Sequence, residues 1–283
     1  GLSQPAVSAA LKRLRGALGD DLFFRKGQRL EPTRRALALE PALRETLTGI
    51  EALIHGPAPF DPRTSSAHFR IAGSDFFAEL LMPRLAGHLQ RLGSAICVHL
   101  VDLVPDNHLA TLDRETVDLA LTPVREFPKR IEFRPGFRSS FSVIARRDHP
   151  RLARAGLHPG QVVPLDLFCD LGHVVFSQEG NSAAMGDAAL ARVGRKRRVA
   201  MTLPVFSGVY RAVAGSDLVA LLPTPLAHHV AGACGLEIFR PPMPLDVAQI
   251  SLAWHRRNSA APGHAWFRDL VAELLAPLDE AAG

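Results

Sequence analysis

The sequence is short of cysteine and of long apolar runs, and each shortage excludes a class of protein. Its three cysteines, Cys97, Cys169 and Cys234, stand far apart without paired spacing, so neither a disulfide framework nor a cysteine-rich zinc site is expected. The longest stretch without a charged residue, 218–236, contains Pro223 and Pro225, which argues against a membrane-spanning helix. The N-terminal residues show no apolar signal core, and we expect a cytoplasmic protein.

The common enzyme motifs are also missing. We find no G-x-S-x-G nucleophile turn, no glycine-rich dinucleotide turn, no G-K-[ST] phosphate loop and no H-E-x-x-H zinc motif. The twelve histidines are scattered, and the adjacent His228 and His229 would point in different directions on a helix. The sequence therefore predicts no enzyme, no cofactor and no metal site.

What the chain does have is a globular composition with a basic head. Of 283 residues, 47% are apolar and 22% charged, which is typical of a folded protein of roughly two domains. The net charge of +5 is concentrated in residues 1–35, which hold eight basic and three acidic side chains, and the remainder is neutral. This asymmetry favours a small module that meets phosphates, joined to a larger neutral body. A solvated basic surface is the alternative.

The head begins with a predicted amphipathic helix that ends at Gly19. Its apolar residues recur at intervals of three and four, at Val7, Leu11, Leu14 and Leu18. Ser3 is a good N-cap, and Pro5 suits the first turn. Short polar groups near this end suit contacts with base edges, and basic groups further along suit phosphates. The residues expected to contact bases or phosphates on this helix are Ser3, Gln4, Pro5, Ser8, Lys12 and Arg13.

Residues 21–30 predict two short strands joined by a basic glycine turn. Arg25 and Lys26 would lie at the tip of this wing, where they would reach the adjoining DNA backbone or minor groove.

A linker helix is predicted over 33–54, because its leucines and isoleucines fall at intervals of four and three, close to a coiled-coil seam. Pro41 should kink it. It reads as a dimerisation helix, or alternatively as a helix packed on its own domain.

The body alternates short apolar runs with amphipathic stretches, which predicts an α/β fold with a largely parallel sheet. A final helix is expected over 263–276. The predicted strands are 69–74, 96–103, 117–122, 141–146, 173–177, 198–203, 218–222 and 250–254.

The run LSQPAVSAALKRLRGALGDDLFFRKGQRLEPT resembles the second half of the winged helix-turn-helix of LysR-type transcriptional regulators, most closely the branch of nodulation and aromatic-catabolism activators. Two helices precede this run in that family, so the resemblance implies a chain that begins partway through the motif. Further along, FSVIARRDHP and ISLAWHRR are similar to the strands that cross between the lobes of the family's effector domain. The resemblance thus covers nearly the whole chain.

The resemblance implies a partial winged helix-turn-helix, a linker helix and a two-lobed effector domain similar to type 2 periplasmic binding proteins. The implied boundaries are 1–32 for the DNA-binding part, 33–55 for the linker helix, 56–67 for a hinge and 68–283 for the effector domain. Lobe I would comprise about 68–140 and 250–276, and lobe II about 141–249. The family motif also adds Arg34 to the DNA-contacting residues.

Hydroxyl side chains end three predicted strands of the body, at Ser74, Thr122 and Ser177. Ligands bind at the carboxyl ends of strands in such sheets, although each hydroxyl alone also suits a helix cap. Phe206 and His173 are candidate walls, or else core residues. With the resemblance, the expected effector site comprises Ser74, Asp75, Phe76, Thr122, His173, Ser177, Asn181 and Phe206.

The sequence therefore predicts a LysR-type regulator whose partners are double-stranded DNA, further copies of itself and a small-molecule effector held between the lobes. The branch resemblance suggests an aromatic acid as effector. Two alternatives remain open: a stand-alone small-molecule-binding protein with a vestigial head, and an unrecognised enzyme in the body.

Overall fold

The computed structural model describes residues 4–27, 29–55, 60–102, 117–123, 126–181 and 184–280. The chain divides into two compact units, 1–59 and 60–283, so that the division falls inside the predicted hinge. Each unit is described by itself. Among the described residues, no helix combines the length and the apolar character that crossing a membrane requires.

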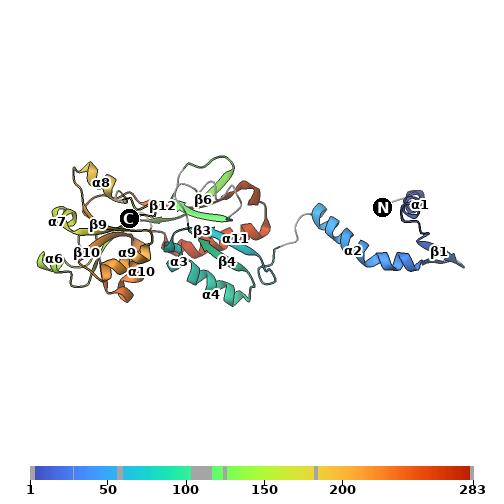
Figure 1. Ribbon diagram of the computed structural model, residues 1–283, viewed down its shortest axis with the longest axis horizontal. Coiled ribbons are helices and arrows are strands. Elements are labelled where there is room, and N and C mark those ends of the chain that lie inside the picture. Colours follow the sequence, from blue (N-terminus) through green and yellow to red (C-terminus); the bar gives the residue numbers. More distant parts are fainter. Residues whose placement is uncertain are drawn as a thin grey trace. The chain divides into compact units, whose positions relative to one another are not determined.

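The first unit contains helix α1 (Gln4–Leu18), the hairpin of β1 (Phe23–Lys26) and β2 (Arg29–Pro32), and helix α2 (Arg34–His55) (Figure 1). The two strands pair antiparallel, with Lys26 opposite Arg29. Gly27 turns the chain with φ +65°, a conformation that glycine adopts without strain. The predicted helix, wing and linker helix are thus all formed, with Pro41 inside α2.

Short polar contacts hold this unit together. The Asp20 carboxylate accepts hydrogen bonds from the Leu22 amide and from the Thr33 hydroxyl, both at 2.7 Å. These bonds lower the pKa of Asp20, that of Thr33 most. The Thr33 hydroxyl in turn accepts from the amide of Ala36 at 3.1 Å, which caps the start of α2. The wing is therefore fixed between the two helices.

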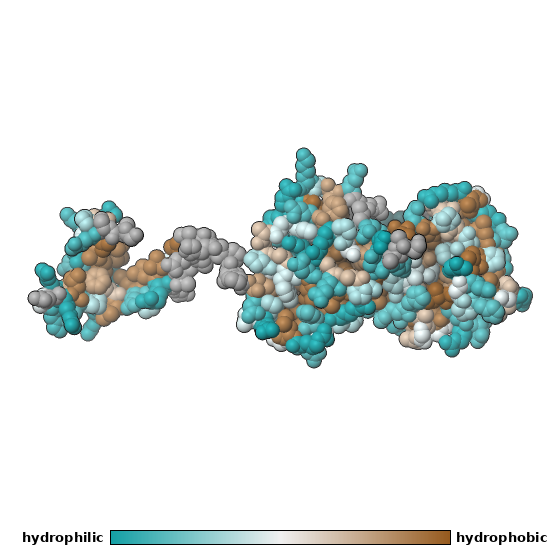
Figure 2. Space-filling model, turned by 180° about the vertical axis from the view of Figure 1, so that it is seen from behind, coloured by the Kyte–Doolittle hydropathy of each residue, from teal (hydrophilic) through white to brown (hydrophobic). Residues whose placement is uncertain are grey.

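Much apolar surface of this unit is open (Figure 2). No residue of α1 is buried, and Val7 and Leu14 are each 50% exposed. Leu43 and Leu47 on α2 are 54% and 57% exposed. An apolar seam of this kind is typical of a helix that packs against another chain.

The second unit holds two five-stranded sheets (Figure 1). Sheet I has the order β4 (Cys97–Val101), β3 (His68–Ala72), β5 (Leu119–Pro123), β12 (Ala248–His255) and β6 (Ile131–Ser139). Sheet II has the order β11 (Leu236–Phe239), β7 (Phe141–Arg146), β10 (Leu218–Pro223), β8 (Gly172–Phe176) and β9 (Arg198–Leu203).

The helices of this unit divide between the two sheets. Those beside sheet I are α3 (Asp75–Leu80), α4 (Met82–Leu92) and α11 (Pro262–Leu275), with η2 (Arg256–Asn258) and η3 (Ala276–Leu278) on either side of α11 in the chain. Those beside sheet II are α6 (Pro150–Arg154), α7 (Leu165–Asp170), α8 (Asp187–Arg192), α9 (Phe206–Ala214) and α10 (Thr224–Cys234). The predicted two-lobed α/β architecture is confirmed.

Each sheet is mixed, which corrects the prediction of a largely parallel sheet. β3, β4 and β5 pair parallel, as do β8, β9 and β10, but the strands that follow a crossing between sheets pair antiparallel. The prediction missed β6 and β11. β6 contains Pro135 and Gly136, and β11 has only four residues, so neither shows the apolar run that marks a buried strand.

The C-terminal segment holds one crossing in place. β6 ends at Ser139 and β7 begins at Phe141, so the chain passes from sheet I to sheet II at Ser140. The Ser140 amide donates to the Glu280 carboxylate at 2.6 Å, and the guanidinium of Arg138 pairs with Asp279 at 3.1 Å. The main core cluster contains Phe77 and Phe137 beside sheet I together with Val209 beside sheet II, so apolar packing is continuous across the crossing.

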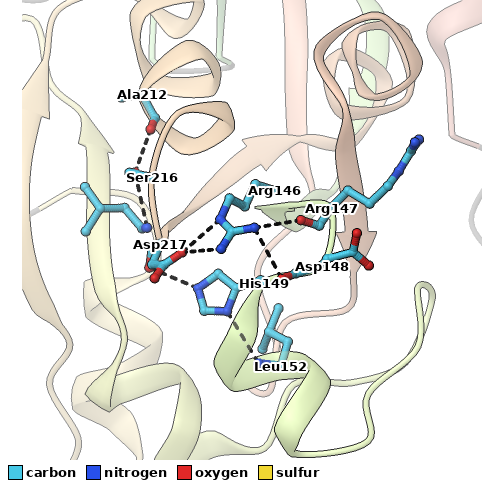
Figure 3. A network of polar contacts seen from close by, with 9 residues as sticks. Arg146, Arg147, Asp148, His149, Leu152, Ala212, Ser216 and Asp217 are labelled. Atoms are coloured by element: carbon cyan, nitrogen blue, oxygen red, sulfur yellow. Dashed lines mark hydrogen bonds and ion pairs between the residues drawn. The ribbon is translucent and has the colours of Figure 1, made fainter.

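A polar network lies in sheet II where β7 ends and β10 begins (Figure 3). Arg146 at the end of β7 pairs with Asp217 at 2.8 Å and donates to the carbonyl of Arg147 at 3.0 Å. The buried His149 accepts from the Leu152 amide through Nδ1 at 3.4 Å and therefore donates through Nε2 to the Asp217 carbonyl at 3.0 Å. This network joins β7, α6 and the turn before β10.

Candidate effector cleft and nucleic-acid face

A cavity of about 320 Å³ lies between the two sheets, where the carboxyl ends of β3, β5, β8 and β10 meet. Loops at such strand ends commonly hold ligands in α/β folds. Both lobes contribute to it. The lining residues are Ser74, Phe76, Phe77, Leu121, Thr122, Pro123, Phe137, Ser139, Phe141, Phe176, Gln178, Met185, Phe206, Pro223, Ala248 and Ile250.

Aromatic rings form much of the wall on each side. Phe176 and Phe206, from sheet II and α9, stack with their centroids 3.9 Å apart. Phe76 stacks on Phe137 with a centroid separation of 5.8 Å and meets Phe77 edge to face at 5.0 Å. Ring edges and faces arranged in this way suit a flat aromatic guest.

Polar groups of the cavity retain hydrogen-bonding capacity. Thr122 is 2% exposed, and its buried hydroxyl has no partner among the described residues. Ser251, directly opposite Thr122 in the β5–β12 register, also has a buried hydroxyl without a partner there. Ser74 is the N-cap residue of α3, but its side chain makes no capping hydrogen bond. The alternative interpretation of Ser74 as an ordinary helix cap therefore does not account for its hydroxyl. Buried hydroxyls are usually bonded, so Thr122 retains an unused hydrogen-bonding group in a residue of the lining.

Four of the eight predicted effector residues, Ser74, Phe76, Thr122 and Phe206, line this cavity. Asp75 does not. Its carboxylate turns to the start of α9, where it accepts from the amides of Phe206 at 2.9 Å and Ser207 at 2.8 Å. Asp75 thus joins α3 of one lobe to α9 of the other. Because two amides already hold its charge, it does not oppose an anionic ligand in the way that a free carboxylate would.

His173, Ser177 and Asn181 are not brought to the cavity. His173 is fully buried in β8, where its Nε2 donates to the Phe168 carbonyl at 2.7 Å, and burial lowers its pKa to about 4. The Ser177 amide pairs with the Leu203 carbonyl, which aligns its backbone with β9. The Asn181 side chain is exposed and donates to Glu179 at 2.9 Å.

Sequence reasoning missed most of the wall. Phe77 and Phe137 were not among the predicted site residues, and β6, which contains Phe137, was not predicted at all. Gln178 is the clearest omission because it follows Ser177 directly. Its amide donates to Asp102 at 2.8 Å, which makes a second bond between the lobes. The signal available in the sequence was the run of polar residues after β8. Ser177 was predicted from this run, whereas its neighbour Gln178 lines the cavity.

A second, wider groove of about 720 Å³ lies against sheet II beside α10. Its hydroxyls are already bonded, since Ser140 and Ser142 each lie 2.8 Å from the Thr224 hydroxyl. The cavity between the sheets, with its unpartnered hydroxyl and aromatic walls, is therefore the better ligand site.

The predicted DNA-contacting residues lie on the surface of the first unit. Ser3 lies outside the described residues. Gln4, Ser8 and Lys12 follow one another at intervals of four along one side of α1. Lys26 pairs with Glu31 at 3.4 Å, an exposed contact that leaves the ammonium accessible. The exposed residues of the predicted set are Gln4, Pro5, Ser8, Lys12, Arg13, Arg25, Lys26 and Arg34.

Comparison with known proteins gives two family matches. The LysR substrate binding domain matches residues 62–276, and the bacterial regulatory helix-turn-helix of the lysR family matches residues 1–37. The chain is 31% identical to the HTH-type transcriptional activator NagR of Ralstonia over 275 residues, covering 97% of this chain and 89% of that protein. It is 32% identical to Nodulation protein D 1 of Sinorhizobium fredii, covering 96% of this chain and 82% of that protein.

Solved structures agree. A probable transcriptional regulator from Pseudomonas aeruginosa is 30% identical with a TM-score of 0.66, covering 96% of this chain and 87% of that one. The regulatory domain of MexT, a transcriptional activator in the same organism, is 25% identical with a TM-score of 0.63, covering 75% of this chain and 99% of that one.

The chain belongs to the LysR family of transcriptional regulators. This confirms the resemblance and the prediction of a regulator, not an enzyme, since its relatives include HTH-type transcriptional activators. The matched helix-turn-helix favours a DNA-binding protein over the stand-alone binding protein. The two matched domains give it two kinds of partner, DNA for the helix-turn-helix and a small molecule for the substrate binding domain.

Proposed function

We propose that this regulator acts in the cytoplasm and responds to a small aromatic acid held between the lobes. Lobe I is taken as 68–140 with 250–276, and lobe II as 141–249. The observation that carries the proposal is the cavity of about 320 Å³, which is lined by phenylalanine rings from both lobes and by Thr122, whose hydroxyl has no partner among the described residues. This volume is at the lower end of the usual range for ligand sites, roughly 300–1,000 Å³, which favours a compact ring system.

The polar groups of the cavity favour a weak acid over a strongly charged ligand. Among the residues that the structure describes, its lining includes no lysine, arginine, histidine or carboxylate. Ser74, Thr122 and Ser139 supply hydroxyls, and Gln178 supplies an amide. These groups can donate to a carboxylate or a phenol, and several such bonds offset the cost of removing the ligand's polar end from water.

Effector binding would act on the bonds that join the lobes. A ligand that touches both Phe76 and Phe206 binds the closed arrangement more tightly than an open one and so favours it. Two direct bonds between the lobes, Asp75 to the start of α9 and Gln178 to Asp102, lie beside the ligand. Linker helix α2 would transmit the change to the DNA-binding unit.

At the DNA, we assign Gln4 and Ser8 to base edges in the major groove. Lys12, Arg13 and Arg34 would hold phosphates, and Pro5 would set the entry of α1. Arg25 and Lys26 on the wing would contact the adjoining backbone. Exposure of all these side chains supports the assignment.

The effector assignment is tested by calorimetry with a panel of benzoic and hydroxybenzoic acids and their amides. Thr122→Val removes the unpartnered hydroxyl at nearly constant volume and should weaken the best ligand about tenfold, since one hydrogen bond is lost. Thr202→Val on β9, outside the cavity, is the matched control and should bind normally. Equal affinity for Thr122→Val and the wild type would contradict the assignment.

A second measurement links binding to regulation. The ligand should change the anisotropy titration of promoter DNA in the wild type, and the same change should require higher ligand concentration in Thr122→Val. Ligand binding without any effect on DNA binding would support the stand-alone binding protein instead. Turnover of the ligand would support an enzyme.

A further inference from the structure

Two histidines and a cysteine meet on sheet I, away from the lining of the cleft. His68, Cys97 and His99 bring one ligand atom each to within 4.8 Å of one another. The Cys97 Sγ lies 3.4 Å from His99 Nε2, and the rings of His68 and His99 stack with centroids 5.9 Å apart and 13° between their planes. Cys97 is partly buried and both histidines are exposed, so solvent ions can reach the cluster.

The sheet itself creates this arrangement. β3 and β4 pair in parallel with His68 opposite Cys97, and opposite residues of paired strands point to the same face. His99 follows Cys97 by two positions, so its side chain also leaves that face. β4 is the edge strand of sheet I. The ligand atoms are therefore placed by regular backbone pairing, not by a loop.

The geometry is close to what a zinc ion requires. Zinc binds thiolate sulfur at about 2.3 Å and imidazole nitrogen at about 2.0–2.1 Å in a tetrahedron, which places neighbouring ligand atoms about 3.5 Å apart. The Sγ to Nε2 distance of 3.4 Å already matches this separation. His68 needs only rotation of an exposed side chain to complete a three-ligand set.

We propose that His68, Cys97 and His99 form a binding site for a thiophilic divalent ion, with Zn²⁺ as the best fit. One thiolate and two imidazoles are ligands that zinc prefers over magnesium or calcium. On binding, Cys97 loses its thiol proton to solvent, and water fills the fourth position. Arg70, exposed on the same face opposite His99, opposes a cation, and the new thiolate charge offsets it.

Spacing along the sequence does not reveal this site, because β3 and β4 are separated by two helices and only the sheet register joins them. A bound ion would tie the first residue of β3 to edge strand β4. It would thereby stabilise the strand through which the chain enters the second unit.

The test uses the full chain, stripped with a chelator and titrated with Co²⁺ as a spectroscopic probe. The wild type should bind one Co²⁺ per chain with a thiolate-to-metal absorption band in the near ultraviolet and strong visible bands typical of a tetrahedral ion. Zn²⁺ should displace it. Cys97→Ser should abolish the near-ultraviolet band, and His68→Ala or His99→Ala should each weaken Zn²⁺ at least tenfold.

The matched controls remove the same residue types elsewhere. Cys234→Ser, and His228→Ala with His229→Ala on α10, should keep the wild-type spectrum and Zn²⁺ affinity. Zn²⁺ should also raise the melting temperature of the wild type and of the controls, but not that of Cys97→Ser. A Co²⁺ spectrum that survives Cys97→Ser, or Zn²⁺ affinity unchanged in both histidine variants, overturns the site.

Discussion

At the scale of single residues, His173 couples stability to pH. Burial lowers its pKa from the ordinary 6.5 to about 4, against the opposing effect of the bond to the Phe168 carbonyl. In the unfolded chain, the His173 side chain therefore binds a proton below about pH 6.5. In the folded chain, the same side chain stays neutral until the pH falls to about 4. The stabilising contribution is full above pH 6.5 and is lost as the pH falls toward 4.

We expect this residue alone to lower the free energy of unfolding by about 2 kcal/mol between pH 7 and pH 5. Urea denaturation at the two pH values measures the change. In His173→Gln, which keeps a donor for the Phe168 carbonyl, the drop should be smaller by that amount. His264, whose pKa burial also lowers, keeps its own contribution in both proteins, so the difference isolates His173. Equal drops in both proteins would refute the buried neutral state.

The same residue shows what sequence can and cannot predict. A histidine and a serine at the two ends of one strand look alike as site candidates, because polarity at a strand end is the only signal. Whether the side chain faces the cleft or the core depends on register and on the helix packed behind it. His173 turns to Phe168 of α7, whereas Thr122 at the end of β5 lines the cavity.

Arg197 shows how a residue outside the cavity lining can position the site. Its side chain is 2% exposed, and its guanidinium donates to Asp187 at 2.9 and 2.7 Å and to the carbonyl of Met185, a cavity residue, at 2.8 Å. Removing one partner of a buried ion pair lowers the free energy of unfolding strongly, because the other charge then stays buried without a partner. Arg197→Met should lower the free energy of unfolding by about 3 kcal/mol.

Chemical denaturation measures this loss. Arg192→Met is the matched control, because Arg192 is 62% exposed in its pair with Asp246, and the change should be below about 1 kcal/mol. Similar losses in both variants would mean that the Arg197 pair contributes no more than a surface contact.

At the scale of elements, α9 depends on the opposite lobe. The amides of Phe206 and Ser207 at its start donate to the Asp75 carboxylate, and Tyr210 on its next turn donates to Glu79 at 2.8 Å. Hydrogen bonds to a charged acceptor are each worth about 1.5–3 kcal/mol. The closed arrangement of the lobes should therefore rely on Asp75.

Asp75→Ala should weaken effector binding about tenfold to a hundredfold without removing a cavity residue, because part of the binding energy must then close the lobes. Hydrogen exchange should become faster at the amides of Phe206 and Ser207. Asp246→Ala, which breaks an exposed pair within lobe II, serves as the control and should change neither quantity. Normal affinity together with slow exchange in Asp75→Ala would show that α9 does not need this contact.

Elements were predictable where one pattern dominates. Helix α1, the wing and the linker helix carry strong periodicity and turn residues, and all of them form. The mixed sheets were not predictable from local sequence. The direction in which β7 or β12 pairs is decided by the two crossings between lobes, and nothing local in FSVIAR or ISLAWH records its partner strand.

At the scale of the whole molecule, the division of charge and of apolar surface matches a division of tasks. Residues 1–35 of the first unit hold the whole net charge of +5, and α2 of that unit has an open apolar seam. The rest of the chain is formally neutral, and the second unit encloses the cavity. The family resemblance predicted which unit binds DNA and which binds the effector, and the fold then showed where the cavity lies. What resemblance could not supply is which side chains of each lobe face the ligand.

DNA binding should separate into a specific and a general part. Gln4→Ala should cost about 1–3 kcal/mol on the promoter site and leave random DNA unaffected, because a base contact is lost. Arg25→Ala should weaken binding to both DNAs alike and reduce the slope of log affinity against log salt by about one, because a phosphate contact is lost. Anisotropy titrations of both DNAs at several salt concentrations measure both effects.

Lys196→Ala, which removes one exposed positive charge in the second unit, is the matched control for net charge and should leave both titrations unchanged. If it lowers affinity and salt slope as much as Arg25→Ala does, general charge attracts the DNA and the wing has no special role. If Gln4→Ala weakens promoter and random DNA equally, α1 does not read bases. The prediction requires that Gln4→Ala weaken binding to the promoter alone and that Arg25→Ala weaken binding to both DNAs alike. Lys196→Ala should weaken neither.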